Sequence, residues 1–126
     1  MTKDFLESKT DYFYVVFRLV IGLLFLLHGL QKMSGIFDGK IALFSLFGAA
    51  GVIETIGGIL LIIGLFTKYV AVITAIEMLV AYFMMHLPNG LSPLANKGEA
   101  SLLFFAAFLV IIAFGARKWA IDNLMH

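Results

Sequence analysis

The chain has 126 residues, enough for one domain, and 62% of them are hydrophobic whereas only 13% are charged. Water-soluble domains contain about 45–50% apolar and about 25% charged residues, so the composition excludes a soluble protein and predicts an integral membrane protein. The net charge of +1 is too small to indicate nucleic-acid binding, and the absence of cysteine excludes disulfides and thiolate metal sites made by this chain.

The apolar residues gather in four long runs, which predict four membrane-crossing helices. About 20 residues cross the hydrocarbon core, and the expected spans are residues 12–30, 48–66, 69–86 and 99–115. The polar residues 1–11 mix charges of both signs and are followed by no signal-peptidase site, so we interpret the first span as retained.

The links between the spans predict how the helices are arranged. Residues 31–40 are expected to form the first extramembrane link, with Lys32, Lys40 and Lys97 as solvated loop charges. Thr67-Lys68 is a tight turn that makes spans two and three antiparallel neighbours, and Pro88 begins a loop before span four. The predicted fold is therefore a single all-α domain, residues 1–126, in the form of an antiparallel four-helix membrane bundle.

The basic residues predict the orientation of this bundle in the membrane. Four spans place both termini on one side. That side holds Lys3, Lys9, Lys68, Arg117 and Lys118, against Lys32, Lys40 and Lys97 on the opposite side. Because positive charge is enriched in cytoplasmic loops, both termini are expected in the cytoplasm.

Glu54 is the most informative residue of the second span, because a charged group at bilayer depth normally faces protein rather than lipid. Gly51 and Gly58 lie three residues before it and four residues after it, on the same helical face. Small residues let helix backbones approach closely in a membrane. Glu54 is therefore expected to point into the bundle.

Arg18 and Glu77 are predicted to form a buried ion pair, with Glu54 above them. Counted down from His28 and His86, which we place near the outer ends of spans one and three, Arg18 and Glu77 reach nearly equal depth. Arginine stays protonated in proteins, so a buried Arg18 is expected to need a carboxylate. Such a pair can serve function or can only fix the helix register.

His28, Glu54, His86 and Glu99 are expected near the outer side of the membrane. Two imidazoles and two carboxylates can bind a metal, relay protons, hydrogen-bond a quinone head group or form a polar mouth without chemistry. The Glu-x-x-His spacing of di-iron bundles is absent, so no metal site is predicted. Nine residues separate Glu77 from His86, so both face inward only if that helix distorts or ends early.

The order and spacing of these residues form one pattern across residues 18–122. It consists of Arg18, Gly22, Phe25, His28, Gly29 and Lys32; Glu54, Gly57, Gly58, Leu61, Gly64 and Thr67; Met78, Ala81, His86, Asn89 and Gly90; Asn96, Gly98 and Glu99; and Trp119 with Asp122. This pattern resembles the DoxX family of small four-span membrane proteins.

The resemblance implies a membrane redox role. Family relatives belong to an archaeal terminal quinol oxidase system, to a thiosulfate:quinone oxidoreductase, and to oxidative-stress complexes with superoxide dismutase and a sulfurtransferase-like partner. It places the protein in a bacterial or archaeal cell membrane. The signature positions that it carries over are Arg18, His28, Glu54, His86, Asn89, Glu99 and Asp122.

Three hypotheses of function follow. The first is a subunit of a quinone-linked redox system whose extracytoplasmic pocket is lined by His28, Glu54, His86, Asn89 and Glu99. No side chain here carries electrons, so this hypothesis needs a bound cofactor such as a quinone, or redox partner proteins. The second is a non-enzymatic membrane scaffold, and the third is a small proton-linked transporter. The bilayer, partner proteins and a second copy of the chain are the expected partners.

Overall fold

The computed structural model describes residues 2–125 and contains helices but no strand within that range. The helices are α1 (Thr2–Ser8), α2 (Thr10–Phe37), α3 (Leu46–Ile63), α4 (Thr67–Ala81) and α5 (Glu99–Phe114). A π-helix η1 (Tyr82–His86) and a 3₁₀ turn η2 (Leu87–Asn89) continue α4, and a 3₁₀ turn η3 (Ile121–Leu124) follows α5. The all-α class expected from the sequence is confirmed.

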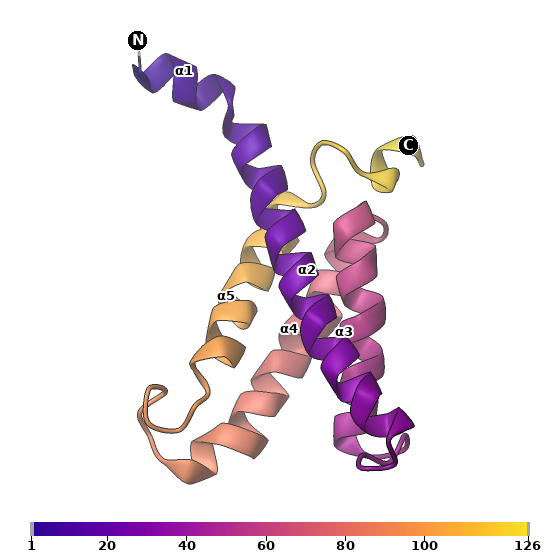
Figure 1. Ribbon diagram of the computed structural model, residues 1–126. Coiled ribbons are helices and arrows are strands. Elements are labelled where there is room, and N and C mark those ends of the chain that lie inside the picture. The colour runs from indigo at the N-terminus through magenta and orange to yellow at the C-terminus, as the bar shows by residue number, and fades with distance from the viewer. Residues whose placement is uncertain (1, 126) are drawn as a thin grey trace.

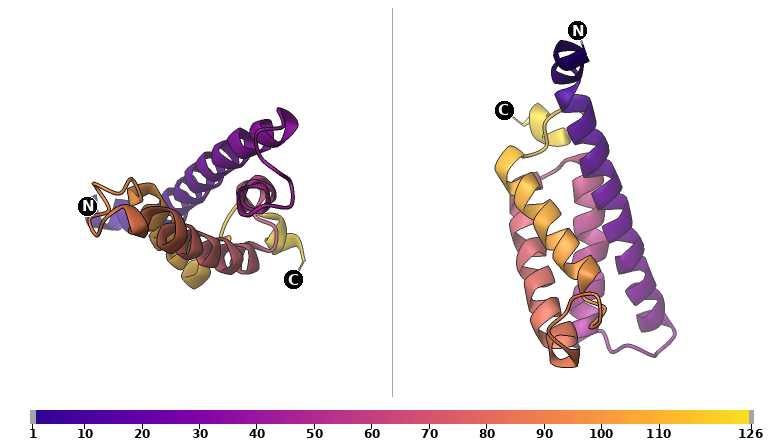
Figure 2. Two further views of the ribbon diagram at one scale, coloured as in Figure 1. Left: turned by 90° about the horizontal axis from the view of Figure 1, so that it is seen from below. Right: turned by 90° about the vertical axis from the view of Figure 1, so that its left-hand side faces the viewer.

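The four long helices run up and down, with both termini at the same end of the molecule (Figure 1). We call this end the terminal side and the other the loop side. Helix α2 packs along α3, and α4 packs along α5, with α3 and α4 in contact between the two pairs (Figure 2). Toward the loop side α2 diverges from α5, as Figure 1 shows.

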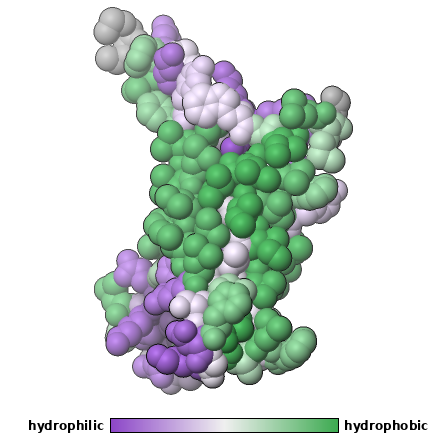
Figure 3. Space-filling view, turned by 45° about the vertical axis from the view of Figure 1, so that its right-hand side comes forward, coloured by the Kyte–Doolittle hydropathy of each residue, from purple (hydrophilic) through white to green (hydrophobic). Residues whose placement is uncertain are grey.

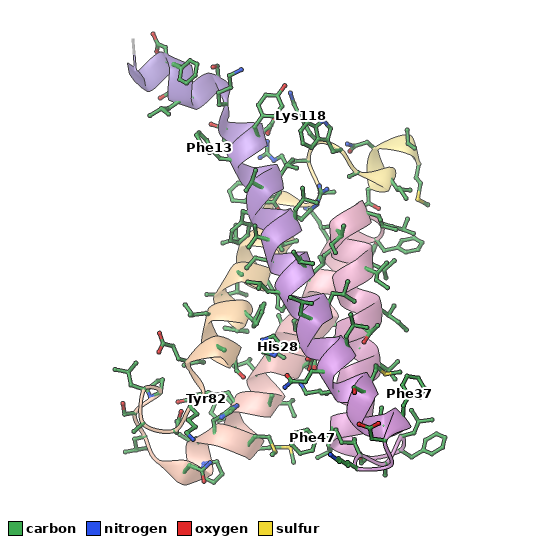
Figure 4. All side chains as sticks on the ribbon, in the orientation of Figure 1. Phe13, His28, Phe37, Phe47, Tyr82 and Lys118 are labelled. Carbon is green, nitrogen blue, oxygen red and sulfur yellow. The ribbon has the colours of Figure 1, made fainter. Side chains whose placement is uncertain are left out.

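Helix α2 is longer than the sequence predicted. It has 28 residues and ends at Phe37, where Asp38 forms the C-cap. The expected link over residues 31–40 is therefore helical up to Phe37, although it contains Gln31, Lys32 and Ser34. As a result, His28 lies well before the end of the helix, as the labels of His28 and Phe37 show (Figure 4).

The ends of α3 follow from local chemistry. Ser45 is the N-cap, and its hydroxyl accepts a hydrogen bond of 3.1 Å from the Gly48 N–H. Gly64 ends the helix with a φ of 71°, a left-handed conformation that glycine adopts without strain. Helix α4 then begins at Thr67, so the predicted tight turn and the antiparallel arrangement of these two helices are present.

Glycines bring α2 and α3 together. A Cβ placed on Gly58 would lie 2.6 Å from the backbone nitrogen of Leu26, and one on Gly29 would collide with Thr55. Both Gly51 and Gly58 are buried, as is Glu54 between them. The expectation that Glu54 faces the bundle is therefore confirmed.

We predict that Gly58→Leu destabilises the bundle by on the order of 1–3 kcal/mol or more, because backbone atoms of α2 occupy the space that the new side chain needs. Thermal unfolding in detergent micelles measures the effect. Ala106→Leu, which adds a similar side chain on the exposed face of α5, is the control and should unfold near the wild-type temperature. Equal melting temperatures for the two variants would contradict the close packing of α2 on α3.

The outer surface fits a lipid bilayer. Three helical segments, Thr10–Phe37, Leu46–Ile63 and Thr67–Asn89, are long and apolar enough to cross a membrane, and Glu99–Phe114 is a shorter apolar helix. A hydrophobic band covers the middle of the molecule and hydrophilic residues gather at both ends (Figure 3). The aromatic residues Phe25, Phe104 and Phe108 fill the core between α2 and α5. The protein is therefore an integral membrane protein.

Candidate functional site

Three charged side chains from three helices meet inside the bundle. The Lys32 ammonium of α2 donates to both carboxylate oxygens of Glu54 on α3, at 2.9 Å and 2.6 Å. Glu77 of α4 faces the same place and interacts electrostatically with both residues. Glu54 is 1% exposed, whereas the Lys32 side chain is 26% exposed. We call this group the Lys32–Glu54–Glu77 triad.

The helix registers explain why these residues meet. The buried residues Val15, Arg18, Gly22, Phe25 and Gly29 form one stripe along α2, spaced by three and four residues. Lys32 is the next position of that stripe, so its side chain reaches toward α3. The position of Gly57 against Thr74 fixes the register of α3 on α4, and it brings Glu54 level with Glu77.

The two carboxyls are in an unusual relation. Glu77 faces Glu54, and the two carboxyls interact electrostatically. Both Glu77 oxygens are buried, and neither accepts a hydrogen bond from any donor in residues 2–125. Like charges that face each other inside a protein disfavour full ionisation of both groups. Ionisable side chains in a membrane interior commonly bind and release protons.

The triad lies beside a cavity of about 290 Å³ between α3 and α4. Apart from the three charged residues, every residue that lines it is apolar. These are Leu46, Phe47, Ala49, Ala50, Ile53, Ile76, Val80, Ala81, Met84 and Met85. Several of them, including Phe47 and Met84, are exposed on the surface that lipid would cover. A mostly apolar cavity with a few converging polar groups is the usual form of a small-molecule site.

The predicted Arg18–Glu77 ion pair is not formed. Arg18 is fully buried, but its guanidinium donates to backbone carbonyls near the terminal side. The acceptors are Leu61 (3.0 Å), Ile62 (3.4 Å), Lys118 (2.9 Å), Trp119 (2.8 Å) and Ala116. The depth count failed because His28 lies nine residues before the end of α2. Arg18 is therefore farther from the loop side than Glu77.

Asp122 belongs to the same terminal-side structure. Its carboxylate accepts hydrogen bonds from the N–H groups of Phe66 (2.6 Å) and Thr67 (2.9 Å), where α4 begins. An acidic group is favourable at a helix N-terminus, and Arg18 is favourable beside the C-terminal carbonyls of α3. These two signature residues fasten the segment after α5 to the α3–α4 turn, and neither lines the cavity of the triad.

His28 is exposed, because it lies one residue before Gly29 and is therefore not part of the buried stripe of α2. Its ring contacts the edge of Phe104 on α5, with ring centroids 5.6 Å apart. The His28 side chain therefore points toward α5, whereas Lys32 on the same helix points toward Glu54 on α3. His28 does not line the cavity.

His86, Asn89 and Glu99 lie around the loop between α4 and α5. We expected Glu77 and His86 to face the same side only if their helix is distorted. Such a distortion is present as the π-helix η1. However, His86 Nδ1 lies 3.2 Å from the Asn96 carbonyl, so the ring contacts the loop. Asn89 and Glu99 are exposed. Of the five residues expected to line a ligand pocket, only Glu54 lines the cavity.

Asn96 organises the loop between α4 and α5. Its side chain is 2% exposed and donates to Tyr82 Oη (3.2 Å) and to the Gly90 carbonyl (2.9 Å). Its Oδ1 accepts from the Gly98 N–H at 2.8 Å. Within residues 2–125, no three His, Cys, Asp or Glu side chains are arranged to hold a metal ion.

Comparison with known proteins places this architecture in a family. The DoxX family model matches residues 13–87, which is more than half of the chain and contains the complete triad. This chain belongs to the DoxX family. A Haemophilus influenzae protein, whose name states no function, is 40% identical over 94% of each chain.

A second relative comes from Bacillus subtilis and is named "Putative oxidoreductase CatD". It is 29% identical over 86% of this chain and 83% of its own length. No solved structure matches this DoxX protein.

Lys32 is the site residue that sequence reasoning missed, since we expected it to be a solvated loop charge. The signal was present, because Lys32 follows Arg18, Gly22, Phe25 and Gly29 at helical spacing and precedes the true end of α2. In this DoxX chain the polar composition of residues 31–40 concealed that the helix continues.

Proposed function

We propose that this protein binds a quinone or quinol in the cavity between α3 and α4, as a membrane subunit of a redox system. The supporting observation is the position of the triad beside an apolar cavity whose other lining residues include lipid-facing ones. The apolar walls suit a molecule that is dissolved in the bilayer. The Lys32 ammonium and the two carboxyls suit the oxygens of its head group.

The chemistry of quinones agrees with this assignment. Oxidation of a quinol releases two electrons and two protons. The carboxyls of the triad are groups that can accept the two protons one after the other and pass them to water. The electrons need an acceptor of the flavin, haem or metal-centre class, supplied by a partner protein. The oxidoreductase name of the Bacillus subtilis relative is consistent with such a system.

We propose further that the cavity opens in the extracytoplasmic half of a bacterial or archaeal cell membrane, with both termini in the cytoplasm. Lys32 belongs to the triad, so it is no longer counted as a loop charge. The basic loop residues are then five on the terminal side against Lys40 and Lys97 on the loop side. This bias supports a cytoplasmic terminal side.

Blocking the cavity tests this function. We expect Ala50→Phe to weaken binding of decylubiquinone by roughly tenfold or more, the equivalent of about 1.4 kcal/mol, because the new ring fills the cavity and leaves the triad intact. Glu54→Gln should weaken it as well. Titration calorimetry of the protein in lipid nanodiscs measures both.

Ala106→Phe is the matched control, since it adds the same ring to an exposed position of α5 outside the cavity. Its affinity should equal that of the wild type. If wild-type protein does not bind decylubiquinone, or if Ala50→Phe binds it as tightly as the control does, the proposed function is wrong. Membrane scaffolding would then be the better hypothesis.

A further inference from the structure

Glu77 has a buried carboxyl without a donor, and it faces the proposed ligand cavity. Both of its oxygens are buried, and no hydrogen-bond donor of residues 2–125 reaches either of them. A buried carboxyl oxygen that accepts no hydrogen bond is costly to a fold, so such an atom beside a binding cavity indicates that a ligand supplies the donor. The ligand group that can fill this role is an O–H or N–H donor.

Lys32, beside Glu77, supplies a hydrogen-bond donor. An ammonium has three N–H donors, and Lys32 directs two of them at the two Glu54 oxygens. A further N–H is therefore left for a ligand that enters the cavity. The charged end of the cavity thus offers one donor, from Lys32, and one acceptor, from Glu77.

A phenolic hydroxyl matches both groups at once. Its O–H donates to Glu77 while its oxygen accepts from Lys32. A quinone carbonyl and an aryl ether can only accept, so they leave Glu77 without a donor.

We infer that Glu77 makes the cavity selective for a ligand that presents a phenolic hydroxyl, so that the reduced form of a quinone binds more tightly than the oxidised form. This inference rests on the proposed function, since it concerns the same cavity. Glu77 acts as a specificity-determining residue. The opposite arrangement, in which a protonated Glu77 donates to a carbonyl, would reverse the preference.

Three probes of nearly equal size test the inference under anaerobic conditions. They are trimethylhydroquinone, trimethylbenzoquinone and the dimethyl ether of the hydroquinone. We expect the wild-type protein in nanodiscs to bind the hydroquinone roughly tenfold more tightly than either of the others, because only it satisfies Glu77. Titration calorimetry measures the three affinities.

A variant with the same shape isolates the role of Glu77. In Glu77→Gln the amide both donates and accepts, so the ratio of hydroquinone to quinone affinity should fall to roughly one. Glu7→Gln, an exposed carboxylate in α1, is the matched control and should keep the wild-type ratio. Melting temperatures verify that both variants are folded.

The outcomes separate the two proposals. If the wild type binds hydroquinone and quinone equally, prefers the quinone, or binds the dimethyl ether as tightly as the hydroquinone, the selectivity inference is wrong while the cavity assignment stands. If none of the probes binds, or if Ala50→Phe leaves their affinities unchanged, the proposed function itself is wrong. The wild-type comparison decides the inference even if Glu77→Gln does not fold.

Discussion

Arg18→Ala should lower the free energy of unfolding by on the order of 3 kcal/mol, because a buried cation that donates to five backbone carbonyls is removed. Three of these acceptors lie in residues 116–119 and the other two at the end of α3. We therefore expect the segment after α5 to become accessible to proteases at temperatures below global unfolding. Thermal melting and limited proteolysis in micelles measure the two effects.

Arg18→Lys should lie between the wild type and Arg18→Ala, since an ammonium cannot reproduce the planar array of guanidinium donors. Arg117→Ala is the matched control, because the Arg117 side chain is 42% exposed and its 3.3 Å ion pair with Asp11 lies at the surface. If Arg18→Ala and Arg117→Ala have the same melting temperature, then Arg18 does not hold the terminal side together.

Lys32→Met is expected to destabilise the protein by about 3–5 kcal/mol and to abolish ligand binding, because it leaves Glu54 as a buried carboxylate without its cation. The methionine keeps the volume of the lysine stem, so the loss reports charge rather than packing. Thermal unfolding and decylubiquinone titration in nanodiscs measure stability and binding separately.

The double variant Lys32→Met with Glu54→Gln shows whether the two charges act as a pair. It should regain part of the lost stability, since neither charge is then left alone, but it should still not bind the ligand. Lys40→Met, at an exposed position after α2, is the control. Stability losses that simply add in the double variant would contradict a coupled pair.

The sequence predicted the features that depend on hydrophobic pattern and on short turns. The all-helical fold, the inward direction of Glu54 and the antiparallel neighbours joined near Thr67 all follow from periodicity and from a link too short for another arrangement. These features are local, or connect adjacent helices. They do not require knowing where a long helix ends.

Two of the errors come from the end of α2. Residues 31–37 look like a loop because they include Gln31, Lys32 and Ser34, yet contacts with α3 keep them helical, as the packing of Gly51 against Lys32 shows. Because His28 was taken as lying near the end of α2, the residues of this helix were assigned the wrong depths in the membrane. Arg18 was therefore matched with Glu77, and Lys32 was placed outside the membrane. The choice of carbonyls rather than a carboxylate by Arg18 depends on how residues 116–119 fold back, which periodicity does not encode.

The difference in length between the helices has a consequence for the surrounding lipid. At about 1.5 Å per residue, α2 is roughly 42 Å long and α5 roughly 24 Å, whereas the acyl region of a typical bilayer is about 30 Å thick. No single bilayer thickness matches the lengths of both helices, so α2 must tilt or protrude and the leaflets must thin beside α5. Short acyl chains should therefore favour the folded protein over long ones.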